Sequence, residues 1–231
     1  MYAYNETYGN YFGNGWNRTA GNIGHKYYMS DEDDFIFRFI HFTKHYRIGG
    51  IGARHVVDLW VYLRTHPELD FAYIEEIIKT LNVYNFYKNT IKLIDMWFND
   101  GETDNKVDLM TDFIFDSGSW GTLEHSSLAS GVKAAQEAGD SEKGKNRMIR
   151  NIIFPSAGDI SHRYTVLEKR PYLLPLIWVR RGVEVLLFRR DNLKLQGKRM
   201  AAVSTEKISE YEKSLEYVGL NFTFEEPEEK H

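Results

Sequence analysis

The chain of 231 residues contains no cysteine, which excludes disulfides, thiolate catalysis and cysteine-ligated zinc, and fits a reducing compartment. Its net charge is only −4, so no overall positive field attracts nucleic acid. No stretch reaches the roughly 18 apolar residues of a membrane span. Residues 1–16 lack the basic and apolar parts of a signal peptide. These absences predict a cytoplasmic protein without a membrane or nucleic-acid partner.

Proline is also scarce, at 5 residues, whereas aromatic residues make up 15% of the chain. The 14 phenylalanines and 15 tyrosines indicate a heavily packed core. A hydrophobic fraction of 42% and a charged fraction of 27% are typical of a globular protein. Together with the helical spacing of the apolar residues, they predict a mainly α fold, a multi-helix bundle with an irregular or short-strand N-terminal arm.

Residues 1–30, rich in glycine, asparagine and tyrosine, have no regular period and are expected to form the arm. The 3.6-residue period and the helix-start and helix-stop residues predict helices at 31–47, 53–65, 71–81, 84–98, 159–168, 171–189 and 205–217. Other stretches are expected to form a loop at 99–108, a helix or strand at 109–115, a turn at 117–121 and a broken, solvated helix at 123–150. The predicted divisions are the arm, a helical domain at 31–224 and a solvated tail at 225–231.

The first predicted helix carries a polar stripe on an otherwise apolar surface. Asp34, Arg38, His41 and His45 recur at the spacing of one helix face. Between residues 35 and 42, every position outside the stripe is Phe or Ile, which is typical of a buried helix. Because buried charge is costly unless it is paired, the stripe requires partners, a cavity or a ligand.

A glycine-rich turn joins the end of this helix to the start of the next one. It should bring Lys44 and His45 close to Arg54 and Asp58. Glycines before a helix start also leave backbone N–H groups available to an anion. We therefore predict a nucleotide or phosphate site. Its three binding residues are Lys44, His45 and Arg54. The five supporting residues are His41, Asp58, Gly49, Gly50 and Gly52.

Simpler interpretations of the same residues remain open. Arg54 and Asp58 also fit a plain ion pair within one helix, and the histidines fit hydrogen-bonded core residues. Two histidines at i and i+4 can share a metal, but no His-Glu-x-x-His pattern is present, so no metal site is predicted. Basic and aromatic residues within 163–199 could contact RNA, although a solvated helix face explains them equally well.

Two consecutive runs carry a resemblance to a known family. Residues 34–46, DFIFRFIHFTKHY, and residues 49–63, GGIGARHVVDLWVYL, form a His-x-x-Lys-His helix, a glycine turn and an Arg-x-x-x-Asp-Leu helix. They resemble the helical half of an uncharacterised family of bacterial nucleotidyltransferases. The resemblance extends over about 29–224, with shorter similarities at 96–98, 114–118, 170–175 and 218–220.

The resemblance implies an α/β domain placed before these helices, with Gly-Ser followed by Asp-x-Asp and a later third carboxylate. Such carboxylates hold two divalent metals, and Mg²⁺ with a nucleoside triphosphate is expected for the family. Here Gly118 and Ser119 have no Asp-x-Asp behind them, and Asp31 and Asp33 open a helix. We therefore expect no cofactor in this chain alone. The arm would be a remnant of the lost domain, in a fragment or in a natural short form that acts with a partner protein.

The prediction for function is a helical module of this family that helps to bind a nucleotide or an acceptor rather than catalysing transfer alone. One alternative is a helical ribonuclease of the toxin–antitoxin type, which would use Arg38 and His45, two residues on one helix face with six residues between them. Another is a non-catalytic scaffold that binds a partner protein. The sequence does not decide whether the chain is itself an enzyme.

Overall fold

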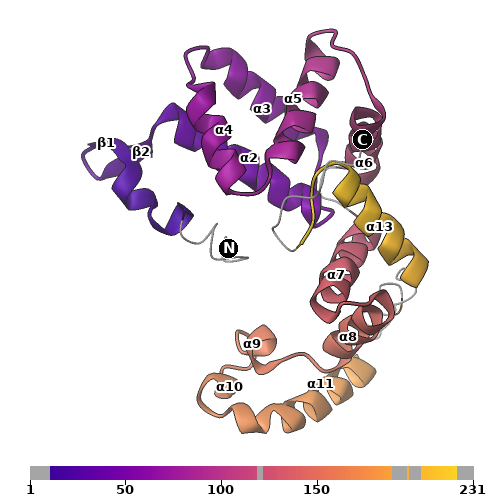
Figure 1. Cartoon of the computed structure of the whole chain (residues 1–231). Helices are drawn as coiled ribbons and strands as arrows, with labels where there is room; N and C mark the ends of the chain where they lie inside the picture. The colour runs from indigo at the N-terminus through magenta and orange to yellow at the C-terminus, as the bar shows by residue number, and fades with distance from the viewer. Residues whose placement is uncertain (1–10, 119–121, 189–196, 198–203, 223–231) are drawn as a thin grey trace. The chain divides into compact units, whose positions relative to one another are not determined.

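In the computed structural model, the described residues are 11–118, 122–188, 197 and 204–222. The chain divides into two compact units, and each is described by itself. Unit 1 contains residues 1–126 and 212–231, and unit 2 contains residues 127–211. The fold is mainly α, as predicted (Figure 1). The predicted tail and residues 119–121 of the predicted turn lie outside the described residues, and the domain limits at 30 and 224 stay a prediction.

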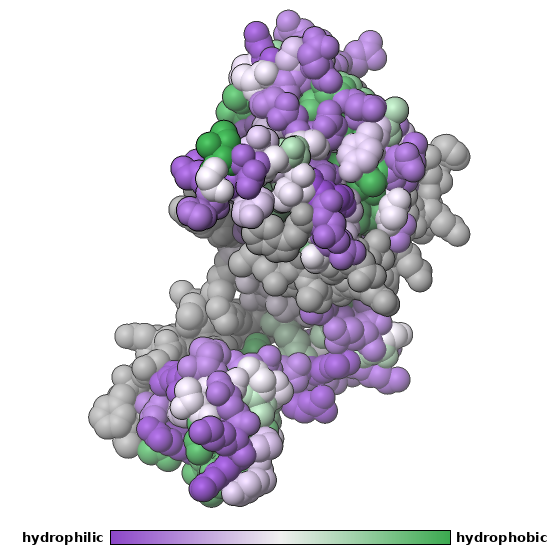
Figure 2. All heavy atoms as spheres, turned by 90° about the vertical axis from the view of Figure 1, so that its left-hand side faces the viewer, coloured by the Kyte–Doolittle hydropathy of each residue, from purple (hydrophilic) through white to green (hydrophobic). Residues whose placement is uncertain are grey.

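The arm contains a short β-hairpin, which agrees with the predicted short-strand arm. A 3₁₀ turn, η1 (Gly15–Arg18), precedes strand β1 (Thr19–Ile23), which pairs antiparallel with β2 (Lys26–Met29). Most side chains of the hairpin are exposed. Figure 2 shows the side of the molecule on which this hairpin lies in Figure 1. Among the coloured residues, the part of unit 1 seen in Figure 2 is mainly hydrophilic.

Two of the first four helices of unit 1 begin at a capping side chain. The Ser30 hydroxyl accepts a hydrogen bond from the Asp33 N–H at the start of the first helix, and Asp70 accepts one from the Tyr73 N–H. The four helices are α2 (Asp31–Arg47), α3 (Ala53–Thr65), α4 (Phe71–Thr80) and α5 (Tyr84–Phe98), of which α2 and α4 are the capped ones. Their predicted bounds are confirmed, with α4 one residue shorter than expected.

The core of unit 1 is aromatic and centres on α2. Phe39 and Phe42 are fully buried, and their ring centroids lie 6.1 and 5.6 Å from that of Phe86 on α5. Tyr46, one helical turn beyond Phe42, approaches the same ring to 5.0 Å. Complete burial of each large apolar side chain contributes about 1.5–3 kcal/mol. This packing fixes which face of α2 turns inward.

The region between 99 and 117 is more helical than predicted. Helix α6 (Asn105–Ser117) begins inside the stretch expected to be a loop, and the ambiguous segment 109–115 is part of it. The reason is Asp104, whose carboxylate accepts hydrogen bonds from the N–H groups of Lys106 and Val107 at 2.9 and 3.0 Å. One capping side chain therefore starts the helix within a polar sequence.

The prediction of a broken helix at 123–150 is confirmed, but the prediction that this helix is solvated is wrong. Helices α7 (Leu123–Ala138) and α8 (Ser141–Ile153) occupy this stretch and are separated at Gly139. The Asp140 side chain caps the start of α8. Val132, Ala135 and Met148 are buried in unit 2. Small residues such as alanine make a weak hydrophobic pattern, yet they allow close packing against a neighbouring element.

Another correction concerns residues 159–168, which were expected to form one helix. Two single-turn helices, α9 (Ala157–Ile160) and α10 (Val166–Lys169), lie here instead, with a turn at 161–165 between them, and they contribute to a small core of Tyr164, Leu167 and Ile177. A 3₁₀ turn, η2 (Pro171–Leu173), leads into α11 (Leu174–Phe188), which covers the predicted helix at 171–189 within the described residues. Among the described residues, no helix has the length and apolarity needed to cross a membrane.

The last helix, α13 (Thr205–Tyr217), has its predicted bounds and ends before Gly219. Gly219 has a φ of +92°, and a Cβ atom there would lie 2.7 Å from the Phe86 nitrogen of α5. The Asn89 side chain secures the contact by donating a 3.0 Å hydrogen bond to the carbonyl oxygen of Val218. The chain thus returns to α5 at a point where only glycine fits.

This contact predicts that Gly219→Ala destabilises unit 1 by about 2 kcal/mol or more, because the substitution combines an unfavourable φ with a backbone collision. Gly24→Ala is the matched control, since Gly24 also has a positive φ of +63° but a Cβ there would have no neighbouring atom within 4 Å. Urea unfolding followed by circular dichroism measures both. If both variants lost the same free energy of unfolding, the close approach of Gly219 to α5 would be contradicted.

Candidate functional site

A glycine turn brings the end of α2 to the start of α3, as predicted. The Gly50 N–H donates to the His45 carbonyl at 2.9 Å, and the Gly49 N–H donates to the Tyr46 carbonyl at 3.1 Å. This pair of hydrogen bonds is the Schellman pattern, which places a left-handed residue just after the helix. Gly49 occupies that position with φ +73°, and a Cβ there would lie 2.5 Å from the Cβ of His125.

Three histidines meet across this turn. His41 and His45 lie on successive turns of α2, with ring centroids 4.5 Å apart. His55, in the first turn of α3, has its ring centroid 5.4 Å from His45 and 6.2 Å from His41. One ring nitrogen from each histidine lies within 4.8 Å of the other two. The turn therefore creates a cluster of half-buried imidazoles that only partly belongs to the predicted site.

His55 is the residue that the sequence interpretation missed. The sequence feature that could have identified it is its position directly after Arg54, in the first turn of α3. A side chain that faces α2 from this turn meets the end of α2. The His55 Nδ1 lies 3.3 Å from the Gly52 carbonyl oxygen. Because a carbonyl oxygen only accepts, this contact favours the tautomer with the proton on Nδ1, leaving the His55 Nε2 as a lone-pair donor.

The surroundings favour the neutral forms of two of these imidazoles. Burial lowers the pKa of His41, and the nearby His55 and Lys44 lower it further. Burial likewise lowers the pKa of His45, followed by the effects of His41, His55 and Lys44, while a hydrogen bond with the Gly50 backbone acts in the opposite direction. Each charged imidazole would lose hydration and face other positive charge, so the neutral forms are favoured.

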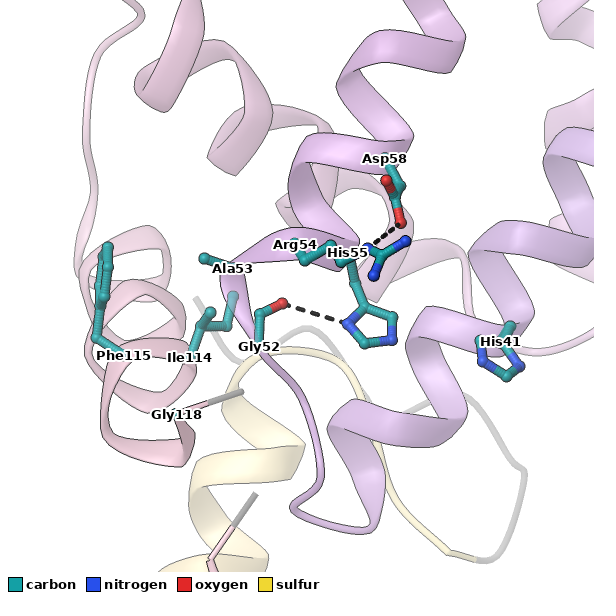
Figure 3. Close-up of a pocket in the computed structure, with 9 residues that line it drawn as sticks. All are labelled: His41, Gly52, Ala53, Arg54, His55, Asp58, Ile114, Phe115 and Gly118. Atoms are coloured by element: carbon teal, nitrogen blue, oxygen red, sulfur yellow. Dashed lines mark hydrogen bonds and ion pairs between the residues drawn. The ribbon is translucent and has the colours of Figure 1, made fainter. Parts of the chain in front are cut away.

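A pocket of about 740 Å³ opens beside the cluster (Figure 3). Its lining comes from α2, α3 and α6 of unit 1, and consists of His41, Gly52, Ala53, Arg54, His55, Asp58, Ile114, Phe115 and Gly118. Figure 3 shows His41 on one side, the start of α3 in the middle and the α6 residues on the other side. Its size falls within the range of about 300–1,000 Å³ that is typical of ligand pockets.

Four of the predicted residues line this pocket: His41, Gly52, Arg54 and Asp58. The Arg54 side chain is 88% exposed, and its Nε lies 3.7 Å from the Asp58 carboxylate, so the ion pair expected within the helix is present. At this exposure the pair contributes little to stability. Of the other predicted residues, His45 joins through its ring contacts with His41 and His55. Gly49, Gly50 and Lys44 belong to the turn and to the last turn of α2.

The polar stripe on α2 is less buried than the sequence suggested. Arg38 is exposed and donates to the Asp34 carboxylate at 2.9 Å, with its guanidinium 4.9 Å from the Tyr62 ring centroid. His41 and His45 are half-buried. The stripe lies at the edge of the core, where neighbouring elements leave it partly in contact with solvent, and its charges therefore need no buried ligand.

A separate polar group fastens the arm. The Asp33 carboxylate is buried and accepts hydrogen bonds from the Tyr11 hydroxyl at 2.7 Å and the Tyr73 hydroxyl at 3.0 Å, while Arg18 lies 3.9 Å away. Burial raises the pKa of both tyrosines, and the Asp33 charge raises it further. Asp33 thus joins the arm, α2 and α4.

Comparison with known proteins gives one family. Residues 4–99 match a family described as an uncharacterised nucleotidyltransferase. The match confirms the resemblance for this part of the chain, and it includes the arm from residue 4 as well as all three clustered histidines. No curated protein and no solved structure matches the chain.

The lowered pKa values predict that folding stability falls as the pH drops from about 7.5 to about 5.5. In this range an unfolded chain binds protons at histidines with an ordinary pKa near 6.5, whereas folded His41 and His45 resist protonation. Urea midpoints measured at several pH values in EDTA test this. The double variant His41→Gln, His45→Gln should show a shallower decline, and an unchanged pH dependence would refute the assignment.

Proposed function

Since residues 4–99 match an uncharacterised nucleotidyltransferase family, we propose that the chain is a helical module of that family which binds the phosphates of a nucleotide at the pocket beside α3. The module does not transfer the nucleotide by itself. The sequence lacks an Asp-x-Asp pair after Gly118 and Ser119, and two divalent metals in such an enzyme require several carboxylates.

The main observation behind the proposal is the exposed position of Arg54 beside the pocket. Its guanidinium projects from the first turn of α3, beside the pocket, and remains 88% exposed despite the ion pair with Asp58. A guanidinium offers five donors in a planar fork that matches phosphate oxygens. Asp58 restrains this group without covering it, so a phosphate can approach the outer edge of the fork.

Backbone groups at the same helix end favour the same ligand. The N-cap residue of α3 is Gly52, which has no side chain to accept hydrogen bonds from the first N–H groups. The positive end of the α3 dipole also favours an anion here. Lys44 supplies a second positive charge near the cluster, as its effect on the pKa values of His41 and His45 indicates.

The far side of the pocket suits a nucleotide base. Phe115 on α6 is 64% exposed although it is a large apolar side chain, and Ile114 lies beside it in the lining. An exposed aromatic ring stacks on any base, with a contribution of about 1–3 kcal/mol. The pocket therefore offers a cationic side for phosphates, at Arg54, and an aromatic side for a base, at Phe115.

The ribonuclease alternative receives less support. Arg38, its proposed cationic residue, is engaged with the Asp34 carboxylate and the Tyr62 ring. The lowered pKa of His45 leaves little imidazolium to act as an acid at neutral pH. For the scaffold alternative, no feature of the described residues identifies a partner protein.

Isothermal titration of the full chain with Mg-ATP tests the proposal. Arg54→Ala should weaken binding about tenfold or more, because charge-assisted hydrogen bonds contribute about 1.5–3 kcal/mol. Arg64→Ala is the matched control: it removes an equal charge from the other end of α3, where Arg64 lies over the Trp60 ring. Binding in the control should change by less than about twofold.

Two results would overturn the proposal. One is the absence of nucleotide binding by the unaltered chain, and the other is equal affinity in the Arg54→Ala and Arg64→Ala variants. Phe115→Ala adds a second check on the orientation of the ligand. It should weaken ATP binding but leave the weaker binding of inorganic triphosphate unchanged, because triphosphate has no base to stack on the ring.

A further inference from the structure

We propose that His41, His45 and His55 form a zinc-binding site. This inference goes beyond phosphate binding and does not rest on it, because it concerns the histidines and needs no nucleotide. It also goes beyond the sequence interpretation, in which His41 and His45 had no His-Glu-x-x-His pattern around them and no metal site was predicted.

The geometry comes close to what zinc requires. One ring nitrogen from each of the three histidines lies within 4.8 Å of the other two. Zn–N bonds of about 2.0–2.1 Å in a tetrahedral site place ligand nitrogens about 3.3 Å apart. A bound zinc ion would therefore draw the three nitrogens closer together by rotation of the imidazoles. His41 and His45 stand at i and i+4 on α2, a spacing by which two helix residues share one metal.

The glycine turn orients the third ligand. The His55 Nδ1 donates to the Gly52 carbonyl oxygen at 3.3 Å, and Figure 3 shows the other ring nitrogen of His55 on the side of the ring that faces His41. Metal-bound histidines almost always donate their second N–H to a carbonyl or a carboxylate in this way. His45 likewise interacts with the backbone of Gly50, in the same turn. Backbone groups of the turn therefore act on two of the three rings.

Protonation and charge are compatible with a bound cation. Zinc binds neutral imidazole, and burial together with mutual repulsion already favours the neutral forms of His41 and His45. Lys44 and Arg54 add positive charge near the cluster, and the Asp58 carboxylate offsets part of it. The binding energy gained by three nitrogen ligands has to exceed the remaining repulsion.

The site would keep one coordination position open. Three protein ligands leave the fourth tetrahedral position to water or to an oxygen of a bound molecule. His41 and His55 both line the pocket (Figure 3), so this position lies at the pocket rather than in the core. Sulfur ligands play no part, because the chain contains no cysteine.

The test uses the full chain, without an added histidine tag, stripped of metal with EDTA and then dialysed. Titration with Zn²⁺ alone should show one ion bound per chain with micromolar or tighter affinity, and no nucleotide is present at any stage. Co²⁺ should give visible absorption bands typical of a tetrahedral site with nitrogen ligands. His55→Gln should weaken Zn²⁺ binding about a hundredfold.

His66→Gln is the matched control. His66 follows the other end of α3 and stacks on Tyr62, with ring centroids 4.1 Å apart, away from the cluster. Its substitution should leave Zn²⁺ affinity unchanged within about twofold. Thermal unfolding then provides a second readout: Zn²⁺ should raise the midpoint of the wild type and of His66→Gln, but not that of His55→Gln.

A measurement on the unaltered chain keeps the proposal testable even if His55→Gln fails to fold. In imidazole nitrogen NMR spectra, Zn²⁺ should shift a nitrogen of His41, His45 and His55 and leave those of His66 unchanged. Failure to bind Zn²⁺, equal affinity in the two single variants, or shifts confined to other histidines would each overturn the zinc site. None of these outcomes bears on ATP binding, so the two proposals fail separately.

Discussion

The reversal of the chain at Gly49 is the constraint on which the rest of the site depends. A left-handed φ of +73° closes two hydrogen bonds onto the end of α2, and the close approach of His125 leaves no room for a side chain. Within four residues the backbone then enters α3 at Gly52. Because the turn is so short, the last histidine of one helix and the first histidine of the next have to meet.

The aromatic core sets the rotation of α2 about its axis. Phe39 and Phe42 pack on Phe86, and this contact commits one face of the helix to the interior. His41 and His45 then occupy the border of that face, where they are half-buried. Such a border is where pKa values shift without full loss of hydration. The packing of apolar residues thus determines the protonation of polar ones.

Two kinds of polar chemistry lie next to each other at this border. Arg54 keeps its charge at any physiological pH and is suited to an anion. Burial lowers the pKa of His41 and His45, which favours their neutral forms, and the nitrogen lone pairs of such imidazoles suit a metal ion. Different side chains at one pocket are thus suited to an anion and to a metal ion. The two proposed ligands are compatible, since the fourth position of a three-histidine zinc site accepts water or an oxygen of a bound molecule.

The sequence by itself determined the mainly α fold and the bounds of α2, α3, α5 and α13, because capping residues, helix-breaking glycines and a 3.6-residue period are local signals. It also predicted that Lys44 and His45 lie close to Arg54, because only a short turn joins the two helices. Only the tertiary structure decided that His55 faces α2, because the rotation of α3 depends on the turn and on the neighbours of both helices. Burial was likewise decided by tertiary contacts: they covered alanines of α7 and Met148 of α8, and they left the stripe on α2 partly open to solvent.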